Sequence, residues 1–467
     1  MNVLTLDFGT SATKAALWAN HRLIALTRAP IATSHPSPDR AEQDPEDWWR
    51  SVVDACAELR AENPGVYSSV DAVSCSAARE TFATFDANLH ALGAGILWSD
   101  SRAVDEARDL GDPDAFRRQT GVALGPSCCA AKMAWVQHRE ATSFRNAAWL
   151  LSPRDFVLAR LTGRVATDPT LASRTGAYDL LGTFVGDETL GDRLPPVVSS
   201  IEPQALPNAA ELALPAKAIA ILGAGDRACE VVGIGATVAE PMVSWGTTAN
   251  VSIPHPGPAP GLPTQGQISR GALEGFVIEA GLSIAGAALD WLVTLTGWPK
   301  AKLVTAAGDV VPGAEGLFAF PWLYGARAPW WRSDVRGAFV GLTHAHGPAE
   351  LTRSVIEGVA IDVARCLDIL CPEAHALSLA GRGATEPLWR TVIAGVTGRP
   401  VLRHHLDEAA SVGARLLIGI ASGESITVDD LNPLVAREEP APDLARDYAA
   451  VREESDRVAS RLMDVHG

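Results

Sequence analysis

The feature that most constrains the fold is a short motif that occurs twice, once near the start of each half of the chain. The apolar run Val3–Leu6 leads into Gly9-Thr10-Ser11, and residues 241–243 lead into Gly246-Thr247-Thr248. The two glycines are 237 residues apart in a chain of 467. A single Gly-Thr-Ser/Thr turn can arise by chance, because glycine-rich turns are common. Its place at the start of both halves favours two related lobes, each opening with a hairpin.

Short apolar runs alternate with helix-like segments, which predicts an α/β fold. Ala15–Trp18 predicts the second strand of the first hairpin, and Asp71–Ser76 predicts a further strand. A helix is expected to begin at Pro45, because Asp44 can cap it and proline suits the first helical position. Pro440–Val465 has apolar residues at helical spacing and predicts a terminal helix. Residues 252–267 contain five prolines and predict a loop or a partly extended connection.

The composition is that of a globular protein with a large core: 47% of the residues are hydrophobic and 20% are charged. The length predicts two or three domains. The net charge of −16 argues against broad binding to nucleic acid or to an anionic membrane surface. The sequence shows no apolar run of about 20 residues and no basic N-terminal region, so neither a membrane span nor a signal peptide is expected. Seven cysteines without a C-x-x-C pair favour a reducing cytoplasm over a disulfide framework or a zinc site.

The first hairpin turn could hold a phosphate group. Thr10 and Ser11 offer hydroxyls and backbone N–H groups, and Gly9 lets the backbone approach an anion closely. Lys14 could add a positive charge. Asp7, beside the same turn, would repel a phosphate unless a cation such as Mg²⁺ stood between them. An equally good interpretation is that Asp7 caps the turn and the hydroxyls satisfy it.

Asp226 follows the apolar run Ala218–Gly225, so its carboxylate is expected at the C-terminal end of a strand. Open α/β sheets bind their ligands at such ends. A carboxylate there could accept the proton of an attacking hydroxyl group. The simpler alternative is that Asp226 caps a helix expected over Cys229–Gly235.

Arg79 and Glu80 follow the strand expected over Asp71–Ser76 and form, with Trp98, a candidate sugar site. The charged pair supplies both donors and acceptors, and an indole face suits the C–H surface of a small polyol. A surface ion pair and a buried core tryptophan are the structural alternatives. Farther along, an apolar run enters Gly381-Arg382-Gly383-Ala384, a turn that could hold a nucleotide base or phosphate.

Together and in this order, the motifs resemble the FGGY carbohydrate kinases, which include xylulokinases, glycerol kinases and gluconate kinases. The resemblance runs from residue 1 to about residue 420. The segments that carry it are 7–11, 41–49, Gly225-Asp226, Gly246–Thr248, 328–338 and 381–384. It implies ATP-dependent phosphorylation of a sugar or polyol hydroxyl, with Mg²⁺. The implied fold is two actin-like, ribonuclease-H-like domains, residues 1–238 and 239–467, with ATP and sugar in the cleft between them.

The resemblance also implies roles for individual residues. Asp226 matches the catalytic base, and Asp7 matches the acid associated with Mg²⁺ through water, with Asp226 as the second residue expected at the metal. Arg79, Glu80, Trp98 and Arg227 match positions beside the sugar. The implied nucleotide and phosphate contacts are Thr10, Ser11, Lys14, Gly246, Thr247, Thr248, Gly381, Gly383, Ala384 and Glu386.

The motifs disagree about the substrate. Arg79-Glu80 and residues 328–337 resemble glycerol kinases, whereas Ser152–Phe156 and Glu386–Arg390 resemble xylulokinases. Ser127-Cys128-Cys129 replaces the tyrosine expected of a glycerol kinase. Arg227 stands where those families carry an amide, and it could favour an acidic sugar or a longer polyol. A ketopentose or a C3–C5 polyol is the first expectation, with glycerol and gluconate as alternatives.

Other classes of protein remain open at this point. A non-catalytic, actin-like ATP-binding regulatory module would share the fold without the reaction. An actin-like filament or chaperone ATPase would leave Arg79, Glu80 and Trp98 without a role. A dehydrogenase is disfavoured, because no G-x-G-x-x-G follows an N-terminal strand. The expected partner is a small sugar or polyol and not a nucleic acid or a membrane; the oligomeric state, a homodimer included, stays open.

Overall fold

Both glycine motifs connect antiparallel strands in the computed structural model, which describes residues 1–257, 266–332 and 334–465. Strand β1 (Asn2–Phe8) pairs with β2 (Ala12–Ala19) across the first turn. Strand β11 (Met242–Trp245) pairs with β12 (Ala249–His255) across the second. Both predicted hairpins are therefore confirmed.

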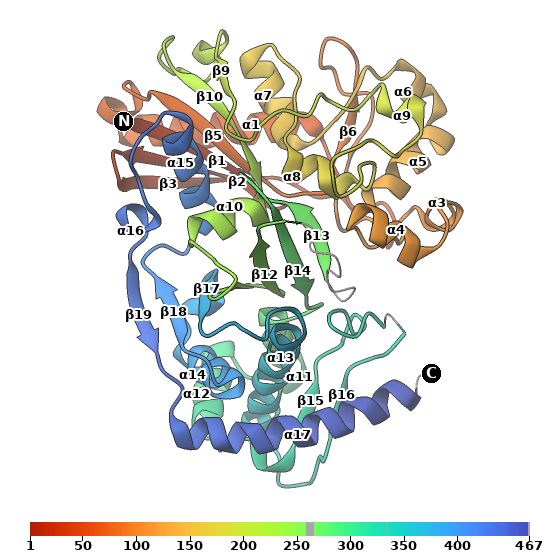
Figure 1. Ribbon diagram of the computed structural model, residues 1–467, viewed down its shortest axis with the longest axis vertical. Coiled ribbons are helices and arrows are strands. Elements are labelled where there is room, and N and C mark those ends of the chain that lie inside the picture. Colours follow the sequence, from red (N-terminus) through yellow and green to blue (C-terminus); the bar gives the residue numbers. More distant parts are fainter. Residues whose placement is uncertain (258–265, 333, 466–467) are drawn as a thin grey trace.

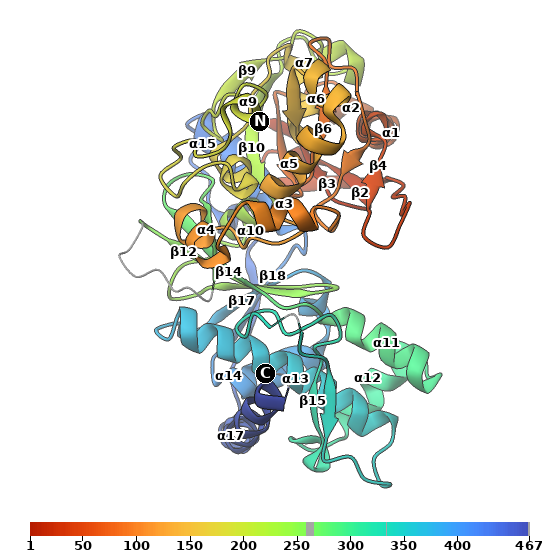
Figure 2. The ribbon, with the colours of Figure 1, turned by 90° about the vertical axis from the view of Figure 1, so that its right-hand side faces the viewer.

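The sheets that grow from these hairpins share one strand order, β3-β2-β1-β5-β10 in the first and β14-β12-β11-β17-β18 in the second. In each, the first three strands are antiparallel neighbours and the last three run parallel. The added strands are β3 (Arg22–Pro30), β5 (Ala72–Ala77), β10 (Ile219–Gly225), β14 (Phe276–Gly281), β17 (Leu377–Ala380) and β18 (Val401–His404). Edge strands β9 (Pro203–Ala205), β13 (Gln267–Arg270) and β19 (Leu434–Glu438) complete them. The internal repeat is thus a repeat of topology, and the two sheets centre two lobes stacked along the long axis (Figures 1 and 2).

Helix α1 (Pro45–Glu62) covers one face of the first sheet. It begins as expected: the Asp44 carboxylate accepts the N–H of Glu46 at 2.9 Å, and Pro45 is the first helical residue. Trp48 and Leu59 are fully buried in the core that α1 forms with the sheet. Burial of such large apolar side chains, each contributing about 1.5–3 kcal/mol, holds the helix on the sheet.

The other face of the first sheet is covered by α15 (Ala409–Ala421), which comes from the second half of the chain. Val412 and Leu416 pack against Val3 and Trp18 in one cluster, and Thr5 and Ser411 share a 2.6 Å hydrogen bond. In Figure 1, α15 lies beside β1 and β5 in the upper lobe. The division expected between residues 238 and 239 assigns α15 to the second domain. In the structure, α15 packs on the sheet of the first lobe.

The second lobe is built around α13 (Pro348–Leu370), most of which is buried. The terminal helix α17 (Pro442–Val465) packs below it, as the sequence predicts, and buries Tyr448. The Tyr448 hydroxyl donates to Glu357 at 2.8 Å and accepts from Arg353 at 2.7 Å. This buried network joins the last helix to the centre of the lobe.

The prediction for residues 252–267 was wrong in part. Residues 252–255 finish strand β12, because Pro254 and its neighbours pair with β14. Pro258, Pro260 and Pro263 fall in residues 258–265, which lie outside the described residues. Ser333 also lies outside them. Within the described ranges no helix is long and apolar enough to cross a membrane.

The remaining elements flank the two sheets. The strands are β4 (Glu42–Gln43), β6 (Ala83–Phe85), β7 (Gly95–Ile96), β8 (Trp149–Leu151), β15 (Phe318–Phe320) and β16 (Ala338–Val340). The helices are α2 (Pro64–Tyr67), α3 (Val104–Asp109), α4 (Pro113–Thr120), α5 (Cys129–Arg139), α6 (Ala141–Asn146), α7 (Pro153–Thr162), α8 (Pro169–Ala172), α9 (Glu188–Gly191), α10 (Asp226–Gly233), α11 (Gly286–Thr296), α12 (Lys300–Gly308), α14 (Pro387–Thr397) and α16 (Val428–Leu431).

Candidate active site in the cleft between the lobes

A cavity of about 1010 Å³, open to solvent, lies between the lobes. Both hairpin turns reach it, through Gly9 and Thr10 from the first lobe and Thr248 from the second. The residues that line it are Gly9, Thr10, Ala78, Arg79, Glu80, Trp98, Arg174, Asp226, Arg227, Thr248, Ala249, Asn250, Gln267, Glu279, Gly281, Leu282 and Arg327. Every residue that the sequence predicts beside a sugar is therefore in one place.

Asp226 is the first residue of α10, at the C-terminal end of β10, and Gly225 occupies the cap position. The helix begins three residues earlier than the sequence predicts, so Asp226 is not its cap. Its Oδ1 accepts hydrogen bonds from Arg79 Nε at 3.0 Å and from the backbone N–H of Arg227 at 2.6 Å. The carboxylate is about one-third exposed to the cleft, at 36%. It is therefore held in one orientation and still open to a ligand.

A bulge in β10 sets where Asp226 emerges. The pairing with β5 shifts between Ile221 and Ala224, and Gly223 there has φ of +79°. A Cβ on Gly223 would lie 1.8 Å from the Cys75 carbonyl oxygen, so only glycine fits. The buried Arg154 side chain donates to the Gly223 carbonyl at 3.2 Å. The strand that carries Asp226 is thus fixed by close packing and by a buried cation.

Arg154 belongs to one of the segments that resemble xylulokinases, and the structure gives that segment a supporting role. Its guanidinium is fully buried between Asp155 and Asp168, each at 2.7 Å. Asp168 also accepts the hydroxyls of Thr170 and Ser200. A buried cation between two hydrogen-bonded carboxylates fixes α7 and α8 against β10.

Arg79 bridges the lobes. Besides Asp226, it donates two hydrogen bonds to Glu279 of β14, at 2.5 and 2.8 Å. Burial alone would raise the pKa of Glu279, but the charge of Arg79 and its hydrogen bonds lower that pKa to about 2. Glu279 is therefore ionised, and the pair ties the sugar side of the first lobe to the second.

Glu80 pairs with Arg174 and not with its neighbour Arg79, so the two do not form the surface ion pair considered above. Burial would raise the pKa of Glu80, but the charges of Arg174 and Arg79 hold it below its usual value. Arg174 also donates to Gln267 of the second lobe. Glu80 has φ of +62°, a left-handed backbone that a non-glycine residue rarely adopts. Such strain is concentrated at functional sites.

Trp98 is not a core residue, because 43% of it is exposed. Its indole Nε1 donates to the hydroxyl of Thr10 at 2.8 Å. Trp98 therefore joins the predicted sugar side of the cleft to the first glycine turn, where a phosphate is predicted.

Asp7 lies beneath the first turn and is largely buried. Its Oδ1 accepts from Ser76 at 2.9 Å, and Lys14 Nζ lies 3.4 Å from its Oδ2. Lys14 also pairs with Glu408 at 2.6 Å, the residue before α15. Burial raises the pKa of Asp7, Lys14 lowers it, and the carboxylate of Asp226 raises it further. Asp7 and Asp226 are thus near enough to repel each other.

The second turn and the glycine-rich segment after β17 lie against the same strand. The carbonyl oxygens of Gly246 and Thr247 accept N–H groups at the start of α11. A Cβ on Gly381 would lie 2.6 Å from the backbone oxygen of Trp245, and one on Gly383 would lie 2.2 Å from its ring. Both glycines are therefore required for close packing on β11. Ala384 is buried, and Glu386 precedes α14.

Not every predicted residue lines the cleft itself. The exceptions are Asp7, Ser11 and Lys14 at or beside the first turn, Gly246 and Thr247 in the second turn, and Gly381, Gly383, Ala384 and Glu386 in the segment after β17. Sequence reasoning missed Arg174, Gln267, Glu279, Asn250 and Arg327, which do line it. Glu279 left a visible signal, a charged residue inside the apolar strand run Phe276–Gly281.

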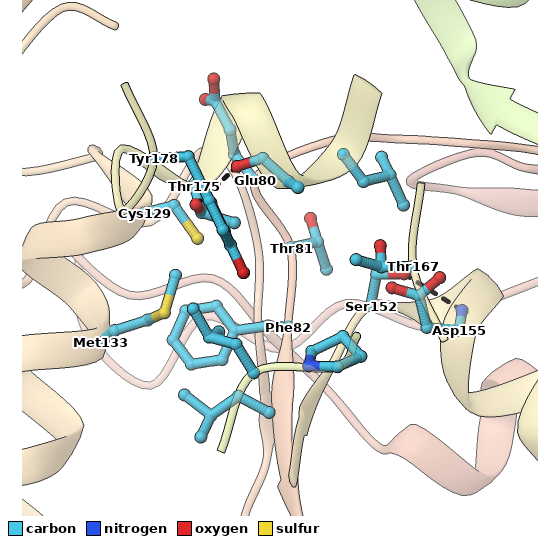
Figure 3. A pocket seen from close by; sticks show the side chains of 15 residues that line it. Glu80, Thr81, Phe82, Cys129, Met133, Ser152, Asp155, Thr167, Thr175 and Tyr178 are labelled. Carbon is cyan, nitrogen blue, oxygen red and sulfur yellow. Dashed lines mark hydrogen bonds between the residues drawn. The ribbon is translucent and has the colours of Figure 1, made fainter. Parts of the chain in front are cut away.

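A smaller cavity of about 470 Å³ is also lined by Glu80 (Figure 3). Phe82, Cys129 and Met133 give it an apolar side, and Thr81 and Ser152 face it with hydroxyls. It belongs entirely to the first lobe, whereas the main cleft is lined by both. Glu80 alone is common to the linings of the two cavities.

Comparisons with known proteins agree with this geometry. Over 98% of both chains, the sequence is 31% identical to the xylulose kinase of Klebsiella pneumoniae. It is 25% identical to the gluconokinase of Bacillus subtilis over 96% of this chain and 93% of that one. The crystal structure of a "xyloylose kinase" from Brucella ovis superposes with a TM-score of 0.91 over the whole of both chains, at 27% identity.

The two lobes also match the two domains that define one family. Residues 2–233 match the N-terminal domain of the FGGY family of carbohydrate kinases, and residues 242–422 match its C-terminal domain. The shared strand order of the two sheets is that of paired actin-like ATPase domains, as the sequence predicts. The chain belongs to the FGGY family of carbohydrate kinases, which are ATP-dependent phosphotransferases.

Proposed function

We propose that this kinase phosphorylates a hydroxyl group of a small sugar or polyol, with Asp226 as the catalytic base. The observation that carries the proposal is the position of Asp226. It lies at a strand end in the cleft, held by Arg79 and beside Glu80, while Thr10 and Thr248 reach the same cleft from opposite lobes. A base, polyol-binding groups and two phosphate turns around one cavity are what transfer from ATP to an alcohol requires.

In the proposed reaction, the substrate hydroxyl gives its proton to Asp226 as its oxygen attacks the γ-phosphorus of ATP in line. The bond from the γ-phosphorus to the β,γ-bridging oxygen breaks, and ADP leaves with its electron pair. Arg79 and the N–H of Arg227 keep the carboxylate aimed into the cleft. The turns around Thr10, Ser11 and Gly246–Thr248 offer N–H and hydroxyl donors to the transferring phosphoryl group. Gly381, Gly383 and Ala384 would lie on the adenosine side, and Lys14 would add positive charge near the first turn. Enclosure between the lobes limits hydrolysis of ATP by water.

Mg²⁺ fits the residues present. The described residues contain no cluster of three His, Cys, Asp or Glu side chains that could hold a metal alone. Mg²⁺ instead uses one or two carboxylates together with water and substrate phosphates. Asp7 and Asp226 supply two carboxylates whose mutual repulsion a cation would relieve. When bound, the ion would neutralise charge on the phosphates of ATP.

A ketopentose or a C3–C5 polyol is the first substrate to test. Arg79, Glu80 and Trp98 suit a polyhydroxylated compound, and similar proteins are named for xylulose, glycerol and gluconate. The buried cysteines Cys128 and Cys129 stand where a glycerol kinase would carry tyrosine, which argues against glycerol itself.

ADP release tests the proposal, measured with glycerol, erythritol, D- and L-xylulose, D-ribulose and gluconate. At least one compound should raise ADP release well above the rate with ATP alone. Asp226→Asn should keep nucleotide binding and lower kcat about 10²–10⁴-fold, because only the base is removed. Near-normal kcat in that variant would remove Asp226 from this role. Release of ADP with none of the compounds would leave an ATP-binding module.

A further inference from the structure

The guanidinium of Arg327 stands in the cleft without a counter-ion. In the part of the chain that the structure describes, no hydrogen bond or ion pair of its side chain is found. Burial is the main reason that the pKa of Arg327 falls below its ordinary value; Glu80 and Glu279 oppose the fall, and Arg174 adds to it. Its charged neighbours are therefore those of the sugar side and not those of the phosphate turns.

Two further guanidinium donors on the same side are unused. Arg174 is 5% exposed, and its Nη1 finds no partner among the described residues, although its other nitrogens bind Glu80 and Gln267. Nε of Arg227 is also buried without a hydrogen bond within the described residues, 3.7 Å from Glu279. A buried N–H without an acceptor destabilises the folded protein, and the cost is greater on a charged group. A ligand that supplied acceptors here would remove that cost.

Among the arginines that line the cleft, Arg327 differs from the other three in its pairing. Glu279 pairs with Arg79, and Glu80 pairs with Arg174. Arg227 pairs with Glu230, and Asp226 accepts a hydrogen bond from Arg79. Within the described residues, Arg327 is therefore the arginine of the lining whose side chain has no ion pair.

We propose that the substrate is a polyhydroxy acid, and that Arg327 binds its carboxylate with help from the free N–H of Arg174. This inference rests on the proposed kinase function and specifies its substrate class. A guanidinium presents parallel N–H groups that match the two oxygens of a carboxylate. A carboxylate brings one negative charge, which matches the single guanidinium of Arg327, whereas a phosphate ester would bring about −1.5 to −2.

The test compares aldonates with neutral compounds of the same chain length, such as D-xylonate against D-xylulose and D-gluconate against D-glucitol, with a sugar phosphate as a third arm. The best aldonate should exceed its neutral counterpart in kcat/KM by about 10-fold or more. Arg327→Gln should lower kcat/KM for that aldonate about 10–100-fold, mainly through KM, because a charged hydrogen bond is lost. The loss in kcat/KM should be smaller with the neutral compound than with the aldonate, because the neutral compound has no carboxylate to lose a charged hydrogen bond.

The control is Arg437→Gln, which removes an exposed arginine of β19 outside the cleft and should alter neither activity. Unchanged affinity for a non-hydrolysable ATP analogue would show that Arg327→Gln is folded. A preference for the neutral compounds or the sugar phosphate overturns the inference and leaves the kinase proposal intact. An equal loss with acid and neutral compounds also overturns it. No ADP release with any compound overturns both.

Discussion

Glu279 and Arg79 form an ion pair whose pH dependence can be tested. The folded-state pKa of Glu279, about 2, lies below the ordinary value of 4.5. The pair therefore contributes its full stabilisation above pH 4.5 and loses it as the pH falls toward 2.

We predict that Glu279→Gln destabilises the protein by about 1.5–3 kcal/mol at pH 7, because buried Arg79 loses its charged hydrogen bonds to Glu279 and keeps its pairing with Asp226. The difference from wild type should shrink as the pH falls below 4.5, since wild-type Glu279 then begins to bind a proton itself. Urea unfolding from pH 3 to pH 7 measures both effects. A difference independent of pH would show that the pair is not what stabilises this side of the cleft.

Gly223, in the bulge of β10, is a second position whose substitution has a predictable effect. Gly223→Ala should destabilise the protein strongly and reduce activity, because the added Cβ would meet the Cys75 carbonyl at 1.8 Å and displace the strand that carries Asp226. Thermal unfolding and ADP release check it. Gly65→Ala is the matched control, because a Cβ added there would meet nothing within 4 Å and its φ is not positive. If both variants behaved like wild type, the bulge would not set the position of the base.

Helices α10 and α15 cross at two glycines. A Cβ on Gly233 would lie 1.9 Å from the Ala409 carbonyl, and one on Gly413 would lie 1.9 Å from the Cys229 carbonyl. Because Asp226 is the first residue of α10, a helix from the far end of the chain helps to set the position of the proposed base.

We predict that Gly413→Ala lowers the free energy of unfolding by about 2 kcal/mol or more, since the two helices must move apart. It should also reduce kcat more than it weakens binding of an ATP analogue. Gly308→Ala in α12 is the control: it meets nothing within 4 Å and should be neutral or stabilising by up to about 1 kcal/mol. Identical behaviour of the two variants would contradict the tight crossing.

The sequence predicts the hairpins, α1 and the terminal helix well, because their signals are local. Asp44 and Pro45 mark the start of α1 without help from distant residues, and the repeated Gly-Thr turns mark the hairpins. The role of α15 could not be predicted in this way. Its apolar residues show that it is buried but not that it packs on the other lobe.

Among the site residues too, those marked by local motifs could be predicted and those that depend on distant pairing could not. Thr10, Arg79, Glu80, Trp98, Asp226 and Arg227 were predicted because each follows a strand or a turn that motifs identify. Glu279 and Arg174 depend on pairing across the cleft, which no local pattern contains. Pro254 was misjudged because a proline-rich run indicates a loop, yet the start of that run continues strand β12.

At the scale of the whole molecule, the two halves of the chain are joined by a shared helix and by ion pairs. Helix α15 covers the first sheet, and Arg79–Glu279 and Lys14–Glu408 link residues from the two halves. We predict that residues 1–238 expressed alone fail to fold cooperatively, because removal of α15 exposes Val3, Trp18 and their neighbours.

Circular dichroism and thermal unfolding of that fragment, beside the full chain, measure this. A soluble fragment with one sharp transition near that of the full chain would contradict it. Adding back a peptide of residues 405–424, which contains α15, should improve the solubility of the fragment if the uncovered face is the cause.

The most direct test of the central claim follows the phosphorus itself. With ATP, Mg²⁺ and the best substrate of the panel, ³¹P NMR should show the γ-phosphate signal replaced by one phosphate monoester on the polyol. Asp226→Asn should form the same product about 10²–10⁴-fold more slowly. Formation of ADP and inorganic phosphate alone, or an unchanged rate in the variant, would contradict transfer to an alcohol activated by Asp226.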